Sequence, residues 1–133
     1  MRKNLLFFFI VLCLCGVESL EARGKPDFIV SDIVVSKDKF IHIKLQNRSV
    51  YDFPVTQKIK EKIFLTIYIN NIKRAEYKVK YLNPKLFKKK STLFFHTNFR
   101  LKKGLKMKVE INRLKIIPES NYLNNRLIKQ LTF

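Results

Sequence analysis

Cysteine, tryptophan, glycine and acidic residues are all scarce in this chain of 133 residues. The two cysteines, Cys13 and Cys15, lie close together near the start of the chain, which excludes a disulfide between distant segments and a cysteine-based zinc site. The three glycines are too few and too far apart to form a GxGxxG or P-loop phosphate site. A GxSxG nucleophile motif is absent as well, and we expect no enzymatic activity.

The scarcity of acidic residues gives the chain a strong positive charge. Ten Asp and Glu residues stand against 28 Lys and Arg residues, and the formal net charge is +18. Hydrophobic residues still make up 47% of the chain and aromatic residues 13%, which is more than a charged disordered tail contains. The length and the composition therefore predict one globular domain with a basic surface.

Residues 1–22 have the pattern of a secretory signal peptide: a basic start, an apolar run that ends at Cys15, and a more polar final part. The apolar run is shorter than the roughly 20 residues that span a bilayer. We expect cleavage after Ser19 or Ala22, and a secreted or periplasmic bacterial protein. Acylation of Cys15 is an alternative that would anchor the protein to a membrane, although Leu14 is larger than the small residue that normally precedes a lipidated cysteine.

Beyond residue 26, polar and apolar residues alternate with the period of two that is typical of strands with one buried face. Asn70-Asn71 suits a two-residue type I′ turn between the third and fourth strands, and Lys103-Gly104 suits a turn before the sixth. The pattern predicts an all-β fold built as a two-sheet sandwich. The seven expected strands cover residues 27–35, 39–47, 63–70, 72–82, 91–99, 105–112 and 126–132.

Within the third and fourth strands, the same alternation assigns each residue to a face. In segment 63–70 the inward set is Leu65, Ile67 and Ile69, and the outward set is Phe64, Thr66 and Tyr68. In segment 72–82 one face carries Tyr77, Val79 and Tyr81, and the other face carries Glu76, Lys78 and Lys80. Residues 54–62 tolerate helix by composition, but the segment is short and we expect an irregular connection.

Four features occur in a fixed order along the chain: PDFIVSDI at 26–33, Asn47 at the end of the second expected strand, the Asn70-Asn71 turn, and IIPESNYLNN at 116–125. In this order they resemble the CARDB domains, which are cell-adhesion-related domains found in bacteria. The chain departs from that family in the longer loop at 83–90. The resemblance implies an immunoglobulin-like sandwich over residues 23–133 and a non-catalytic role in adhesion, binding or structural contact at the cell envelope.

The segment IIPESNYLNN at 116–125, called the closing motif below, contains side chains that can satisfy the polar backbone of a tight corner. Asn side chains bond to nearby backbone groups and accept left-handed conformations, and a carboxylate accepts from backbone amides. The residues concerned are Glu119, Asn121, Asn124 and Asn125. Because calcium takes six to eight oxygen ligands and the motif has one carboxylate, calcium binding is only the weaker alternative.

Basic residues gather in the middle and second half of the chain. If their strand faces adjoin, they form a stripe that attracts polyanions through counterion release. The expected partner is then a protein or an anionic polymer: lipopolysaccharide, anionic phospholipid, acidic polysaccharide or extracellular nucleic acid. The candidate residues are Lys85, Lys88, Lys89, Lys90, Arg100, Lys102, Lys103, Lys106 and Lys108.

The same lysines have a second interpretation, a solvated surface without a dedicated ligand. Lys, Ile, Asn and Phe are the residues that an A+T-rich genome encodes most often. Residues 1–22 contain two basic and two acidic residues, so the net charge of +18 stays with the expected domain. Export disfavours cytoplasmic nucleic acid as a partner, and membrane contact is expected only through the basic surface or a lipid anchor.

The two histidines, His42 and His96, fall at outward positions of their strands. Two imidazoles without a third ligand make a poor metal site, so we interpret them as surface residues. We expect no metal, no cofactor and no small-molecule substrate.

Overall fold

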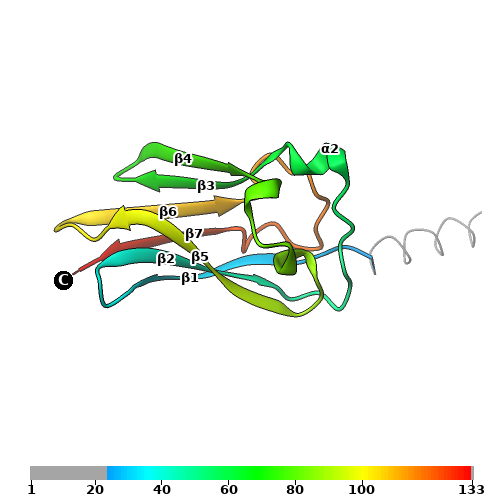
Figure 1. The fold of residues 1–133 in the computed structure, drawn as a ribbon, viewed down its shortest axis with the longest axis horizontal. Helices are drawn as coiled ribbons and strands as arrows, with labels where there is room; N and C mark the ends of the chain where they lie inside the picture. Colours follow the sequence, from blue (N-terminus) through cyan, green and yellow to red (C-terminus); the bar gives the residue numbers. More distant parts are fainter. Residues whose placement is uncertain (1–23, 133) are drawn as a thin grey trace, which may run out of the picture.

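The computed structural model describes residues 24–132, which form a sandwich of two antiparallel sheets (Figure 1). The two-sheet sandwich predicted from the alternation is confirmed. The three-stranded sheet has the order β1 (Phe28–Val35), β2 (Phe40–Asn47), β5 (Ser91–Arg100). The four-stranded sheet has the order β4 (Ile72–Lys78), β3 (Ile63–Ile69), β6 (Leu105–Ile111), β7 (Arg126–Leu131). The predicted signal peptide and Cys15 lie outside the described residues.

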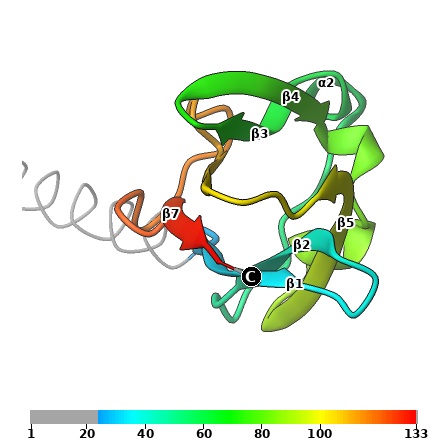
Figure 2. The same ribbon diagram turned by 90° about the vertical axis from the view of Figure 1, so that its left-hand side faces the viewer.

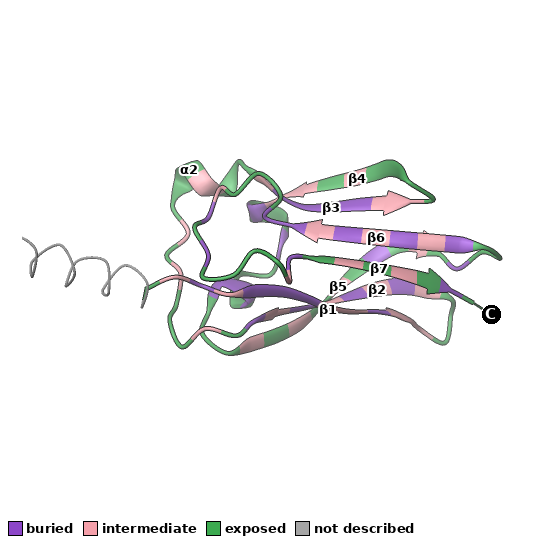
Figure 3. Cartoon of the chain, turned by 180° about the vertical axis from the view of Figure 1, so that it is seen from behind, coloured by how far each residue is buried: buried purple, intermediate pink, exposed green. Residues whose placement is uncertain are grey.

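The core fills the space between the two sheets, which face each other in the end-on view of Figure 2. Inward and outward residues alternate as predicted along β2, β5 and β6, and Figure 3 shows this as bands of buried and less buried residues. Ile41, Ile43 and Leu45 of β2 are fully buried in the same core cluster as Met107, Val109 and Ile111 of β6. The period of two therefore located the core correctly over most of the chain.

The prediction that Phe64 points outward is wrong. In the pairing of β3 with β4, Ile63 is opposite Lys78 and Leu65 is opposite Tyr77, so Phe64 is the extra residue of a β-bulge. The bulge interrupts the alternation, and Phe64 lies in the core with only 1% of its surface exposed. Thr66 is buried too, between its cross-strand neighbours Glu76 and Glu110.

Two connecting segments differ from the prediction. Segment 54–62 contains one turn of helix, α2 (Gln57–Lys60), because the Thr56 hydroxyl accepts a hydrogen bond from the Ile59 amide and caps its start. The predicted fourth strand is too long, since β4 ends at Lys78 and a 3-10 turn, η1 (Val79–Tyr81), follows. A second 3-10 turn, η2 (Pro84–Phe87), then leads to β5.

The hairpin between β3 and β4 turns on Asn70 and Asn71, as predicted. Both residues have positive φ, +50° and +68°, which a type I′ turn requires. The connection between β5 and β6 passes through Gly104, also at positive φ. These two turns lie together at one end of the sandwich, called the hairpin end below; the opposite end, with α2, η1, η2 and residues 112–125, is called the closed end (Figure 1).

Candidate anion-binding site

The predicted basic residues do not form one continuous surface. Lys85, Lys88, Lys89 and Lys90 precede β5 at the closed end, and we call them the loop lysine cluster. Arg100, Lys102 and Lys103 come at the other end of β5. Because β5 has ten residues, the two groups are separated by roughly 30 Å of extended chain. A single small ligand cannot contact both groups.

Lys106 and Lys108 lie on the outer face of the four-stranded sheet. The Lys108 ammonium is 3.5 Å from a carboxylate oxygen of Glu110 and 4.1 Å from the centroid of the Tyr68 ring. Lys106 is the cross-strand neighbour of Gln130. The charge of Lys108 is thus partly compensated within the protein. Lys106 is hydrogen-bonded through its backbone to Asn70 at the hairpin end, but neither lysine lines the cavity described next.

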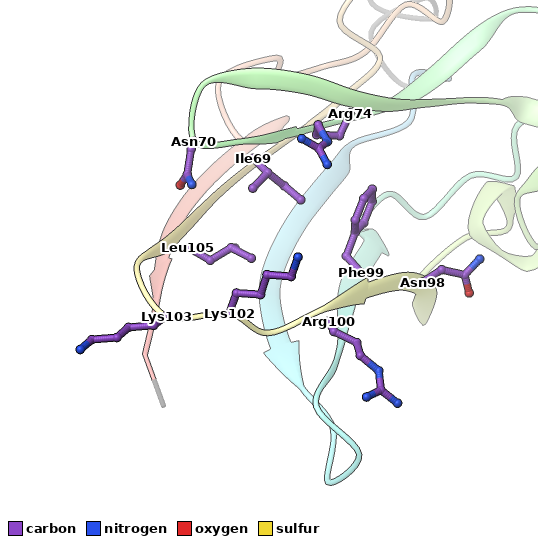
Figure 4. Close-up of a pocket in the computed structure, with 9 residues that line it drawn as sticks. All are labelled: Ile69, Asn70, Arg74, Asn98, Phe99, Arg100, Lys102, Lys103 and Leu105. Atoms are coloured by element: carbon purple, nitrogen blue, oxygen red, sulfur yellow. The ribbon is translucent and has the colours of Figure 1, made fainter.

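A cavity of about 520 Å³ opens at the hairpin end (Figure 4). It lies between β4 and β5, the edge strands of the two sheets, beside the two turns. We call it the hairpin-end pocket. Its lining residues are Ile69, Asn70, Arg74, Asn98, Phe99, Arg100, Lys102, Lys103 and Leu105.

Four cations surround the pocket. Lys102 and Arg74 reach into the space between the strands, whereas Arg100 and Lys103 extend outward from its rim (Figure 4). The Arg100 guanidinium also lies 4.8 Å from the centroid of the Phe40 ring. None of the ion pairs between residues 24 and 132 involves any of these four side chains. None of these four cations is therefore directly paired with a carboxylate of the described chain.

Arg74 reaches the pocket because of a second bulge. Ile67 is opposite Ala75 and Tyr68 is opposite Lys73, so Arg74 is the extra residue on β4. A bulge re-aims the side chain at its position, and here it accompanies an arginine that faces the opposite sheet (Figure 4). Sequence reasoning left Arg74 out of the candidate site, because only the approach of β4 to β5, across the two sheets, brings it near Lys102.

The floor of the pocket is apolar. Leu105 is buried, and Ile69 and Phe99 are half-buried. An apolar floor with a basic rim can receive an anionic group together with the carbon skeleton that carries it. The arrangement suits a charged ligand with hydrophobic or sugar-ring surface better than a free inorganic ion.

The closing motif occupies the closed end and makes a different use of its polar groups. One oxygen of the Glu119 carboxylate accepts a 2.7 Å hydrogen bond from the Phe28 amide. Its other oxygen accepts from the side-chain amides of Asn112, at 2.6 Å, and Asn125. Burial raises the pKa of the Glu119 carboxyl, although these N–H donors oppose the rise. We call this group the carboxylate corner.

The two other asparagines of the motif, Asn121 and Asn124, lie outside the carboxylate corner and make one local and one long-range contact. The side-chain oxygen of Asn121 accepts from the Leu123 amide at 2.9 Å, which is an Asx turn. The Asn124 side chain donates to Asp27 at 3.0 Å and so connects the motif to the start of β1. The sequence did not identify Asn112 as a member of the carboxylate corner. The available signal was its position directly after strand β6, which is like that of the buried Asn47 at the end of β2.

The two histidines meet across the three-stranded sheet. His42 of β2 is in register with His96 of β5, and their Nδ1 atoms are 3.0 Å apart. Among residues 24–132, no group of three or more His, Cys, Asp or Glu side chains has the arrangement of a metal site.

Comparisons with known proteins found no match for the chain among family models, curated proteins or solved structures. The described part of the chain also contains no helix long and apolar enough to cross a membrane.

Proposed function

We propose that the protein is an exported, non-catalytic binding module of the bacterial cell envelope that holds acidic polymers at its hairpin-end pocket. The observation that carries this proposal is the group of four cations around the pocket, with no carboxylate paired to any of them among residues 24–132. Adhesion or structural contact with the envelope would follow from that binding.

The order of the strands supports the immunoglobulin-like part of this proposal. In immunoglobulin-like sandwiches, strands A, B and E share one sheet, and strands C, F and G share the other. Here the first, second and fifth strands pair in one sheet, and the third, sixth and seventh are adjacent in the other. The resemblance of the motifs at 26–33 and 116–125 to CARDB domains points to the same fold family and to an extracellular role.

Electrostatics favours an anionic ligand. Four like charges around one cavity repel each other, and an anion that enters it relieves the repulsion. Arginine binds carboxylate, sulfate or phosphate groups through two parallel hydrogen bonds, so Arg74 adds geometric selectivity to the attraction. The half-buried Phe99 supplies apolar surface for a sugar ring. Acidic polysaccharide, lipopolysaccharide included, is therefore the ligand class we favour.

The test compares two variants with the same net charge. In one, Arg100, Lys102 and Lys103 of the hairpin-end pocket are replaced by serine; in the other, Lys88, Lys89 and Lys90 of the loop lysine cluster are replaced. Binding to heparin, a soluble acidic polysaccharide, is measured over a salt series. We expect the logarithmic salt slope to fall by about three in the pocket variant and to change little in the loop variant.

An equal reduction of the salt slope in the two variants would show that net charge alone governs heparin binding, and the pocket would have no special role. An unchanged slope in both would contradict the proposal entirely. Parallel measurements with lipopolysaccharide and duplex DNA identify the preferred polymer. A purely electrostatic surface should bind each polymer with an affinity that follows the charge density of the polymer alone.

A further inference from the structure

The His42–His96 pair belongs to a row of cross-strand neighbours on the outer face of the three-stranded sheet. Lys44 is opposite Phe94 next to the pair, and Gln46 is opposite Thr92 beyond it. His96 is exposed and His42 is half-buried, so both rings can be reached from solvent. The backbone pairing of the central strand β2 with the edge strand β5 places the two rings side by side, and neither histidine has a part in the hairpin-end pocket.

The distance between the imidazole nitrogens is the separation that one metal ion requires of two adjacent ligands. Imidazole binds divalent metals at about 2.0 Å. Two adjacent ligands then lie roughly 2.8 Å apart around a square-planar ion and roughly 3.3 Å apart around a tetrahedral one. The Nδ1 atoms of His42 and His96 are 3.0 Å apart, between these values, and the rings are nearly perpendicular at 82°.

We propose that His42 and His96 together bind a divalent copper ion through their Nδ1 atoms. Copper is favoured because it forms the most stable complexes of the first-row divalent metals with nitrogen ligands. Two imidazoles alone make a poor site for most metals, but copper accepts a square-planar or tetragonal arrangement in which solvent ligands complete the coordination. The exposed face leaves room for those solvent ligands.

The metal replaces a hydrogen bond that already holds the rings together. Without metal, one Nδ1–H donates to the Nδ1 of the other ring. With metal, both Nδ1 atoms become ligands and each ring carries its proton on Nε2, which is the alternative neutral tautomer. No net proton is lost by the pair when both imidazoles are neutral, and no backbone movement is needed.

The experiment measures copper binding in a C13S/C15S background, because free thiols bind copper on their own. Cu²⁺ affinity is determined by calorimetry, and the bound ion is examined by electron paramagnetic resonance for coupling to nitrogen. We expect one ion per chain, with affinity roughly 100-fold lower in either His42→Gln or His96→Gln, because the second imidazole binds within the same molecule. The matched control Lys44→Gln keeps both rings and removes a neighbouring positive charge, so it should bind copper at least as tightly.

Wild-type affinity in both histidine variants would place the ion elsewhere and overturn the proposal. A loss in only one of them would indicate a site with a single histidine and would overturn the pair. Because both side chains lie on an outer face, the variants should fold, and circular dichroism without metal checks this. A copper-dependent rise in melting temperature that disappears in both variants would support the site independently.

Discussion

The two ends of the sandwich use their polar residues in opposite ways. At the closed end, the Glu119 carboxylate is 5% exposed and binds three N–H groups from three different segments. At the hairpin end, Arg74 and Lys102 face a cavity and make no ion pair with the described residues. Polar groups of the first kind hold the protein together, whereas those of the second kind remain available for a ligand.

Aromatic packing follows the same division. Phe28, Phe64 and Phe87 form a trio at the closed end, with ring centroids 5.2 to 5.6 Å apart in edge contacts. At the hairpin end, Phe99 is only half-buried and borders the cavity. Stability should therefore depend mainly on the closed end, and substitutions at the hairpin end should be better tolerated.

The strongest test of this difference is Phe64→Ala. Removing a fully buried ring from the trio leaves a cavity beside Phe28 and Phe87, and we expect the free energy of unfolding to fall by about 4 kcal/mol. Urea denaturation followed by circular dichroism measures the change. Phe99→Ala at the pocket is the matched substitution and should cost about 1 to 2 kcal/mol. Similar losses for the two variants would contradict the assignment of stability to the closed end.

A smaller effect is expected when the carboxylate corner is opened. Glu119→Ala leaves the Phe28 amide and the side chains of Asn112 and Asn125 without their acceptor, which should lower the free energy of unfolding by about 3 kcal/mol. The adjacent Ser120→Ala is the control, because Ser120 is exposed and its hydroxyl makes only a long, 3.4 Å hydrogen bond to the Pro26 carbonyl, so the loss should stay below about 0.5 kcal/mol. If Glu119→Ala unfolds at the same urea concentration as the control, the corner contributes no stability.

The smallest effect concerns the turn beside the pocket. Gly104 has φ +72°, and no atom lies within 4 Å of an added Cβ, so Gly104→Ala introduces backbone strain without a steric clash. We expect a loss of about 1 kcal/mol in the free energy of unfolding. Thermal denaturation measures this loss, and an unchanged melting temperature for Gly104→Ala would mean that the turn can relax.

Lys103→Ala in the same turn is the matched variant. It should leave the melting temperature nearly unchanged while it weakens binding to heparin.

The sequence predicted most of the fold because the alternation of residues survives wherever the strands pair regularly. It failed at Phe64, since a bulge is a property of how two strands pair and leaves no local mark in the sequence. It also missed the one-turn helix at Gln57–Lys60, which is too short for a helical period to be recognised. Both errors lie where long-range pairing or capping decides the local structure.

The candidate site was predicted only in part for the same reason. Arg100, Lys102 and Lys103 belong to the basic residues that gather in the second half of the chain, and the sequence therefore predicted them. Arg74 lies 26 positions before Arg100, and only the approach of β4 to β5 brings the two to one cavity. The loop lysine cluster was grouped with these residues because all of them are basic, although the expected strand at residues 91–99 already separates the two groups.

The bulge at Arg74 has a consequence for the behaviour of the protein at high concentration. Strand β4 is an edge strand, and its free backbone groups are a template on which another chain could extend the sheet. A bulge twists such an edge out of register, and flanking lysine and arginine make the approach of an identical edge unfavourable. The residue that helps to form the pocket therefore also protects this exposed sheet edge against aggregation.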